Sequence, residues 1–160
     1  MRRLINSPIG SITLLARDHA ITGLYFGDQD PDGSKNQQES PALAPILDLC
    51  ERELAAYFAG ELWKFTVPIR PTGTSFRERV WDELIKIPYG ETASYLDIAH
   101  RINNPKAVRA VGGANHNNPI SIIVPCHRVI GSNGSLTGYG GGLDAKRWLL
   151  DLEMKHRKEN

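Results

Sequence analysis

The chain has 160 residues, of which 41% are hydrophobic and 23% charged, and this is the composition of an ordinary globular protein rather than a disordered or fibrous one. No apolar run approaches the ~20 residues of a membrane span, and the basic start Met1–Asn6 lacks the apolar core of a signal peptide, so we expect a cytoplasmic protein without a membrane partner. The net charge of +1 does not itself predict nucleic-acid binding, but residues 71–160 hold 12 Lys and Arg against 9 Asp and Glu, which places the positive excess where a phosphate-contacting surface would belong.

The first seventy residues are predicted to form a small three-stranded sheet with one helix. Three strand-like stretches are separated by turn residues: Arg3–Asn6, Ser11–Ala16 and Ala20–Phe26. His19 falls in the second turn and is expected to be exposed. The polar stretch 27–40 is typical of a loop, and a helix is predicted from about residue 42 to 58, ended by Gly60. Cys50 lies in the amphipathic pattern of this helix and is interpreted as a small core residue.

A second domain is expected to follow a linker at residues 67–74, which carry two prolines and a glycine. This divides the chain into an N-terminal α/β domain, residues 1–70, and a mainly helical C-terminal domain, residues 71–160. The C-terminal domain starts with a helix that Ser75 would cap, with Glu78 as its capping-box partner, and that runs to about residue 87. Trp81 follows the apolar spacing of this helix and is predicted to lie in the core. The fold class is therefore α/β of the α+β type.

Residues 94–115 have the pattern of a helix-turn-helix within this second domain. Ser94 and Asp97 form a capping box at the start of a short helix. Asn104 is suited to cap the next helix, and Pro105 to be its first residue. An ordinary helical hairpin in a core would give the same pattern.

The composition of the second of these helices favours a DNA-binding helix-turn-helix over an ordinary helical hairpin. Its small residues, including Ala110 and Gly113, would let the backbone approach another surface closely. Lys106 and Arg109 lie three positions apart on one side, where they are available to phosphates.

The next informative segment is Pro125-Cys126-His127, which follows the apolar run Ile120–Val124. We predict that the run is a short buried strand that the proline ends, with the cysteine at its mouth. A thiol is a useful nucleophile only as thiolate, and a neighbouring imidazole can activate it. Adjacent residues on an extended segment point to opposite sides, so a turn or a water would have to connect the two side chains. For an isolated pair, an inert cysteine beside a satisfied histidine is the alternative.

The five residues Pro125–Val129 form a string that is the acceptor-cysteine signature of the O6-alkylguanine-DNA alkyltransferase family, and the chain resembles this family from Phe76 to Glu153. The glycine-rich segments 109–115 and 137–143 contribute to the resemblance, and Ser7–Gly10 extends it faintly to the start of the chain. The resemblance implies DNA repair by irreversible, single-turnover alkyl transfer from O6-alkylguanine in double-stranded DNA, with no cofactor, by a protein that acts as a monomer. It leaves activity on O4-alkylthymine open.

The resemblance also implies catalytic roles for four residues. Cys126 would accept the alkyl group, and His127 would act on its thiol through a water. Glu153, in a C-terminal amphipathic helix, would orient the imidazole, in the logic of a nucleophile, base and orienter. Asn118 would join the active-site turn to the helix-turn-helix by hydrogen bonds. Without the resemblance, Glu153 would be interpreted as an ordinary surface charge.

The same resemblance places other residues at the DNA or in the pocket. The target base must rotate out of the duplex to reach a buried thiol, and Tyr95 would crowd its 3′ phosphate while Arg109 fills the gap it leaves. A helix-start aromatic packed on the core is the alternative for Tyr95. The DNA-contacting set is completed by Asn104 and Lys106, and the pocket set is Pro125, Val129, Tyr139 and Gly140. Other members carry serine, alanine or a bulkier residue where this chain has Gly140, so the accepted alkyl size is not predicted.

Three other functions are weighed against this one. A lesion-binding protein that flags damage without catalysis would have lost the cysteine that this chain keeps. A transcription regulator would need an effector domain for which 160 residues leave no room. A Cys-His hydrolase would need an oxyanion hole. No metal is expected, because the chain has no CxxC and no Cys/His cluster, and neither a phosphate-cradling loop nor a dinucleotide fingerprint is present.

Overall fold

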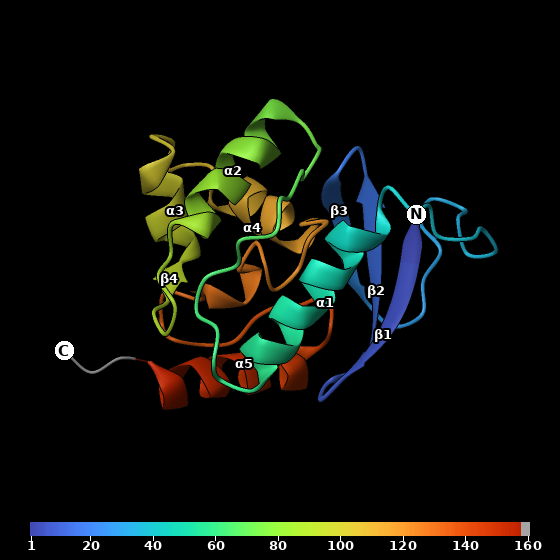
Figure 1. Cartoon of the computed structure of the whole chain (residues 1–160). Helices are drawn as coiled ribbons and strands as arrows, with labels where there is room; N and C mark the ends of the chain where they lie inside the picture. Colours follow the sequence, from blue (N-terminus) through green and yellow to red (C-terminus); the bar gives the residue numbers. More distant parts are fainter. Residues whose placement is uncertain (158–160) are drawn as a thin grey trace.

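A computed structural model describes residues 1–157, and it begins with a three-stranded antiparallel sheet (Figure 1). The strands β1 (Arg2–Ser7), β2 (Gly10–Arg17) and β3 (Ala20–Phe26) lie in sequence order. Asp18 and His19 form the two-residue turn between β2 and β3, and both have positive φ angles, of 51° and 62°, as a type I′ hairpin requires. The three predicted strands are confirmed, each at nearly its predicted limits, and His19 is exposed as expected.

Helix α1 (Ala44–Phe58) packs against all three strands. Its buried residues recur every three or four positions: Leu47, Cys50, Glu53, Leu54 and Tyr57. The helix begins two residues later than predicted and ends as predicted, because Gly60 adopts a φ of +77° after the C-cap and donates to the carbonyl of Tyr57. Cys50 is fully buried in the core, as expected.

The segment after α1 does not behave as a free linker. Residues 61–74 cross the front of the molecule between α1 and α2 (Figure 1), and Ile69 forms a parallel bridge with Ile21 of β3. The buried carboxylate of Glu53 accepts hydrogen bonds of 3.0 and 2.8 Å from the backbone N–H groups of Thr66 and Val67. This segment therefore extends the packing of the sheet rather than only joining two halves.

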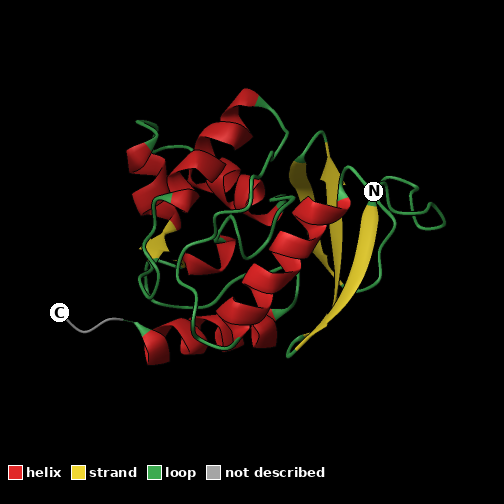
Figure 2. Cartoon of the chain, in the orientation of Figure 1, coloured by secondary structure: helices red, strands yellow, loops and turns green. Residues whose placement is uncertain are grey.

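The remainder of the described chain is mainly helical, and Figure 2 shows these helices gathered beside the sheet. Its elements are α2 (Ser75–Ile85), β4 (Ala93–Ser94), α3 (Tyr95–Arg101), α4 (Val108–His116), the 3₁₀ helix η1 (Cys126–Arg128), β5 (Val129–Ile130) and α5 (Leu143–His156). The short strands β4 and β5 pair in parallel. The α+β fold class is confirmed. Residues 158–160 of the predicted second domain lie outside the described residues.

Two predicted helix starts need correction. Thr74, not Ser75, caps α2, because its extended backbone (ψ 159°) allows its side chain to accept from the N–H of Arg77. The helix α4 starts at Val108 instead of after Asn104, whose backbone completes the end of α3 by donating to the carbonyl of Ala99. The capping box of Ser94 and Asp97 at the start of α3 is confirmed.

The predicted strand at residues 120–124 is wrong. Only Ile120 makes a strand-like bridge, to Leu24 of β3, and the chain then turns, so that Val124 donates to the carbonyl of Ile120 over 3.0 Å. Ile122 has a φ of 72°, which no strand contains. The run is apolar because the turn is buried in the core, and burial alone does not distinguish a strand from a turn.

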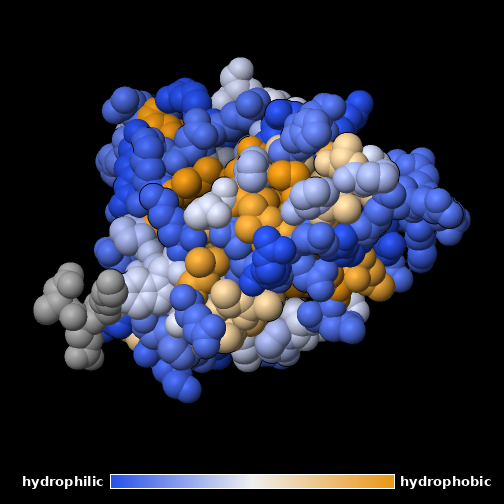
Figure 3. All heavy atoms as spheres, in the orientation of Figure 1, coloured by the Kyte–Doolittle hydropathy of each residue, from blue (hydrophilic) through white to orange (hydrophobic). Residues whose placement is uncertain are grey.

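One hydrophobic core runs through both halves of the molecule. It includes Leu24 and Leu54 from the N-terminal half, and Trp81 and Leu149 from the helical half. The indole of Trp81 donates 2.8 Å to the carbonyl of Ala114, so its predicted core position is confirmed. On the face shown in Figure 3, apolar side chains gather in the middle, between α1 and α2, within a largely polar surface. Within residues 1–157, every helix is too short or too polar to cross a bilayer.

Candidate active site

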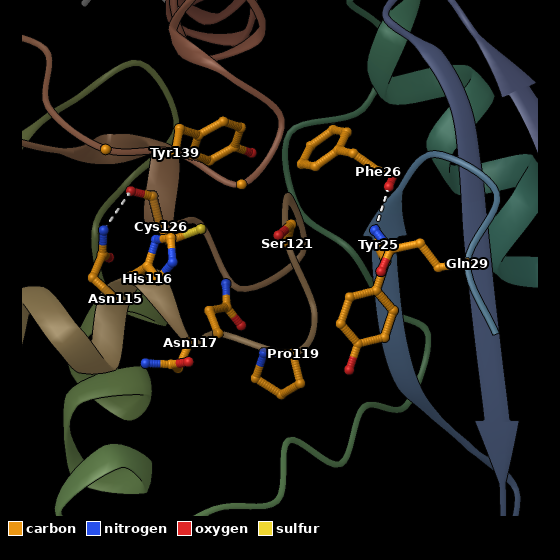
Figure 4. A pocket seen from close by; sticks show the side chains of 13 residues that line it. Tyr25, Phe26, Gln29, Asn115, His116, Asn117, Pro119, Ser121, Cys126 and Tyr139 are labelled. Carbon is orange, nitrogen blue, oxygen red and sulfur yellow. Dashed lines mark hydrogen bonds between the residues drawn. The ribbon is translucent and has the colours of Figure 1, made fainter. Parts of the chain in front are cut away.

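A pocket of about 290 Å³ lies at the end of the turn that carries Cys126. The end of β3, the end of α4, the turn after it and the 138–140 loop surround the pocket (Figure 4). Its lining residues are Tyr25, Phe26, Gln29, Asn115, His116, Asn117, Asn118, Pro119, Ser121, Cys126, Gly138, Tyr139 and Gly140. Of these, the sequence analysis predicts only Asn118, Cys126, Tyr139 and Gly140 as site residues, and it misses the other lining residues, including all three from the N-terminal half.

Cys126 stands at the first position of η1, and Figure 4 shows its sulfur pointing into the pocket. The residue is only 4% exposed, and burial raises the pKa of its thiol. Hydrogen bonds with the side chains of Asn118 and Ser121 and the nearby charge of Lys146 act in the opposite direction, since they favour the thiolate. The sulfur is therefore held in a shielded place with groups around it that stabilise its charged form.

His127 is fully buried and points its Nε2 at Glu153, at 2.6 Å. An ionised carboxylate only accepts hydrogen bonds, so Nε2 carries the proton and Nδ1 keeps a free lone pair. Nδ1 is buried and has no hydrogen-bond partner among residues 1–157. Burial lowers the pKa of this imidazole, although Glu153 opposes the shift. A neutral histidine with an unused Nδ1 is suited to accept a proton.

The carboxylate of Glu153 lies at the centre of a buried polar cluster. Burial by itself would raise its pKa, but hydrogen bonds from His127 and Arg128 outweigh burial and hold the pKa well below its usual range. Arg128 donates from Nε and Nη2 over 2.7 and 3.0 Å, and Tyr57 donates its hydroxyl over 2.6 Å. The N–H of Gly90 adds a contact of 3.1 Å. The structure thus brings Glu153 to His127, and this carboxylate has five hydrogen bonds that fix its position.

The sequence analysis misses the contributions of Tyr57, Arg128 and Lys146. The Nζ of Lys146 is buried and donates to the carbonyls of Val129 and Thr137, over 2.7 and 2.9 Å. It thereby ties β5 to the loop that forms the pocket, and burial lowers the pKa of its ammonium group. Spacing along α1 and α5 indicates that Tyr57 and Lys146 face inward, but not which polar partner each one meets.

Asn118 joins α4 to the turn that carries Cys126. Its Nδ2 donates 2.8 Å to the carbonyl of Val124, and its Oδ1 accepts from the N–H of Ile120 over 3.0 Å. Asn115, one turn earlier, donates over 3.4 Å to the carbonyl of Cys126 (Figure 4). The active-site turn is therefore held from the end of α4.

The four residues predicted to form the substrate pocket are not all found there. Tyr139 and Gly140 line it, and the hydroxyl of Tyr139 is buried with no hydrogen-bond partner in the described part of the chain. Val129 lies beneath the site, fully buried and paired with Ala93. Pro125 lines a different cavity, of about 610 Å³, between residues 63–69 and the end of α2.

The residues predicted to contact DNA lie in and around α3 and α4. Asn104, Lys106 and Arg109 are exposed. Tyr95 is half-buried, and its hydroxyl accepts from the side chain of Thr137 over 3.1 Å. Tyr95 also lines a cavity of about 320 Å³, which shares Asn115, His116 and Gly138 with the Cys126 pocket. This shared lining connects the helix-turn-helix surface to the thiol.

Comparisons with known proteins show what the whole chain is similar to. The family profile "6-O-methylguanine DNA methyltransferase, DNA binding domain" matches residues 75–155, and "6-O-methylguanine DNA methyltransferase, ribonuclease-like domain" matches residues 1–71. A curated relative from Mycolicibacterium paratuberculosis, named methylated-DNA–protein-cysteine methyltransferase, is 51% identical over 96% of this chain and 92% of its own length. One of the same name from Methanosarcina acetivorans is 48% identical, over 94% of this chain and 96% of its own. The crystal structure of Mycobacterium tuberculosis OGT in complex with DNA is similar with a TM-score of 0.84 and 49% identity, covering 97% of this chain and 93% of that one.

Proposed function

Since the chain belongs to the 6-O-methylguanine DNA methyltransferase family, we propose that Cys126 is the cysteine to which it transfers the alkyl group. Its activity is DNA repair, in which a methyl group moves from methylated DNA to a cysteine of the protein itself. The observation that carries the assignment is the position of the two thiols. Cys126 lines the pocket, whereas Cys50 is fully buried in α1, where burial raises the pKa of its thiol to about 12.

The site supports a simple displacement. The thiol proton of Cys126 passes through a water to Nδ1 of His127, and the sulfur attacks the alkyl carbon in line with guanine O6. The S–C bond forms as the C–O6 bond breaks, and the electron pair leaves with the guanine, which takes up a proton in turn. Tyr139 lines the pocket, and its buried hydroxyl, which has no partner within residues 1–157, can donate a hydrogen bond to the base. The thioether is stable, so each molecule acts once.

The burial of the thiol supports base flipping as the step by which the alkylated base enters the pocket. A guanine stacked in a duplex cannot bring its O6 substituent to a residue that is 4% exposed, so the nucleotide must rotate into the pocket. In this proposal, Tyr95 stands where the pocket meets the helix-turn-helix surface and presses on the target phosphate. Arg109 takes the place of the flipped base, while Lys106 and Asn104 contact the DNA backbone.

The lesion and the state of the protein are further parts of the proposal. O6-alkylguanine in double-stranded DNA is the proposed substrate, and a single copy of the chain is proposed to act. A non-catalytic lesion-binding protein is not favoured, because the thiol of Cys126 is present in the pocket and His127 is already paired with Glu153. The division into domains 1–70 and 71–160 is likewise a proposal, in which the second domain carries the chemistry.

The stoichiometry of the reaction tests the proposed function. With a tenfold excess of duplex DNA containing O6-methylguanine, transfer should stop at about one methyl group per protein molecule, since the thioether cannot be reversed. The methyl groups lost from DNA and gained by protein are counted by chromatography of the nucleosides and by intact-protein mass. Sustained turnover beyond one group per molecule would contradict the proposal.

Replacing Arg109 separates base flipping from the chemistry. Arg109→Ala should slow repair of duplex DNA by about 10- to 100-fold, because holding a base outside the stack costs a few kcal/mol. Reaction with the free base O6-benzylguanine should remain near the wild-type rate. Arg17→Ala removes the same charge from an exposed residue of the sheet and serves as control. An equal loss on both substrates would place Arg109 in support of the pocket instead.

A further inference from the structure

We propose that Phe26, at the end of β3 in the N-terminal half, is the wall of the alkylguanine pocket that limits the size of the transferred alkyl group. This inference rests on the proposed function, since it takes Cys126 as the acceptor. It gives the N-terminal sheet a direct part in substrate selection, in addition to its part in the core. Figure 4 shows Tyr25, Phe26 and Gln29 across the pocket from Cys126 and Tyr139.

Hydrogen bonds from two directions fix this wall in place. The side chain of Gln29 donates 2.6 Å to the carbonyl of Phe26, and its N–H donates 3.0 Å to the hydroxyl of Thr13, a fully buried residue of β2. That hydroxyl in turn donates 2.7 Å to the carbonyl of Gly27. The residues on both sides of the turn after β3 are therefore anchored to the sheet, and Phe26 cannot withdraw easily.

The sheet is also tied directly to the opposite side of the pocket. The N–H of Leu24 donates 2.9 Å to the carbonyl of Pro119, and the N–H of Ser121 donates 3.3 Å back to the carbonyl of Leu24. Pro119 and Ser121 both line the pocket, and the side chain of Ser121 lowers the pKa of the Cys126 thiol, against the effect of burial. The separation between the thiol and Phe26, two residues after Leu24, is thus set by backbone bonds.

The ring of Phe26 contacts the loop that would hold the base. Its centroid lies 5.4 Å from that of Tyr139, at an angle of 58°, which is an ordinary aromatic contact. A Cβ atom added at Gly141 would come within 2.9 Å of the same ring, so the loop backbone passes close to it. Only a glycine permits this approach without a shift of the ring or the loop.

The position of Phe26 within the pocket indicates what it limits. The cavity beside α4 shares Asn115, His116 and Gly138 with the pocket but does not include Phe26. Of the shared residues, Asn115 donates to the carbonyl of Cys126, and Figure 4 shows the ring of Phe26 across the pocket from both. A base that enters from the helix-turn-helix side therefore arrives on the Cys126 side of the pocket, opposite the ring. A methyl group ends at the sulfur, whereas the remainder of a larger group must occupy the space between the sulfur and Phe26.

Reaction rates with two free bases of different alkyl size test this inference. The rate constants of O6-methylguanine and O6-benzylguanine are measured for the wild type, Phe26→Leu and Phe26→Ala. The ratio of the benzyl rate constant to the methyl rate constant should rise in that order, by about 10-fold for alanine. An apolar pocket that gains room for a few more carbon atoms of the substrate changes the ratio of two rate constants by about this factor. Using free bases removes DNA binding from the comparison.

Phe76→Ala is the matched control, because Phe76 is also a half-buried aromatic residue packed on the core but is not among the lining residues. It should leave the ratio unchanged, and thermal unfolding of all variants identifies a general loss of structure. An unchanged or lowered ratio in a folded Phe26→Ala overturns the inference, as does an equal fall of both rates. Peptide mapping of the wild-type adduct keeps the two proposals apart: alkylation elsewhere than at Cys126 would contradict the proposed function itself.

Discussion

Cys126→Ser should abolish alkyl transfer and leave binding to duplex DNA nearly unchanged. The hydroxyl of serine is close to the thiol in size and keeps its contacts with Asn118 and Ser121, but it is a far weaker nucleophile at neutral pH. Stability should stay within about 1 kcal/mol, since the substitution creates no large cavity. Loss of O6-methylguanine from labelled duplex measures the reaction, and a gel-shift titration measures the binding.

Cys50→Ser is the control for the loss of a thiol as such. A hydroxyl in the fully buried place of Cys50 should cost about 1–3 kcal/mol of stability, but transfer should proceed in the folded protein. Residual transfer by Cys126→Ser together with inactivity of a folded Cys50→Ser would move the acceptor to α1 and refute the assignment.

Glu153→Gln should have the second large effect, on both stability and rate. The substitution leaves the buried guanidinium of Arg128 without its charged partner, and breaking a buried ion pair in this way costs about 3–5 kcal/mol. Nε2 of His127 also loses the carboxylate that keeps its proton in place. Urea unfolding monitored by tryptophan fluorescence gives the change in free energy, and the reaction with O6-benzylguanine gives the rate.

The pH dependence of that reaction identifies the role of Glu153. Burial raises the pKa of the Cys126 thiol, so the wild-type rate should increase with pH above neutrality as the thiolate fraction grows. If His127 and Glu153 act as one unit, Glu153→Gln raises the thiol pKa further and moves this increase to higher pH. Adding Glu153→Gln to His127→Ala should then change the rate little, because a base that is already absent needs no orienter. An unchanged rate–pH profile in Glu153→Gln would make the residue purely structural.

Local signals in the sequence were sufficient for most of the fold. The three strand-like stretches between turn residues, the box formed by Ser94 and Asp97, and Gly60 at the end of α1 each depend on neighbouring residues, and all are confirmed. The strand prediction for residues 120–124 failed because the four buried apolar residues of this run look the same in a strand and in a turn. Here the deciding contact is the bridge between Leu24 and Ile120, 96 positions apart, which no local pattern encodes.

The site residues also fall into those that could be predicted from the sequence and those that could not. The string around Cys126 identified the thiol and its histidine, and the resemblance supplied Glu153, which the structure places 2.6 Å from His127. Tyr57 and Phe26 could not be predicted, because each looks like an ordinary core aromatic within its own element. Their contacts with Glu153 and Tyr139 arise only when α1 and β3 pack against the helical half.

The most direct test of the account is to locate the transferred group. The protein is incubated with an equimolar duplex containing O6-methylguanine, digested, and its peptides are analysed by tandem mass spectrometry. The account predicts one added group of about 14 Da, a methyl replacing a thiol hydrogen, on the peptide that contains Cys126 and on no other. A methyl group on Cys50 or on a non-cysteine residue, or repair of the DNA with no adduct on the protein, would contradict it.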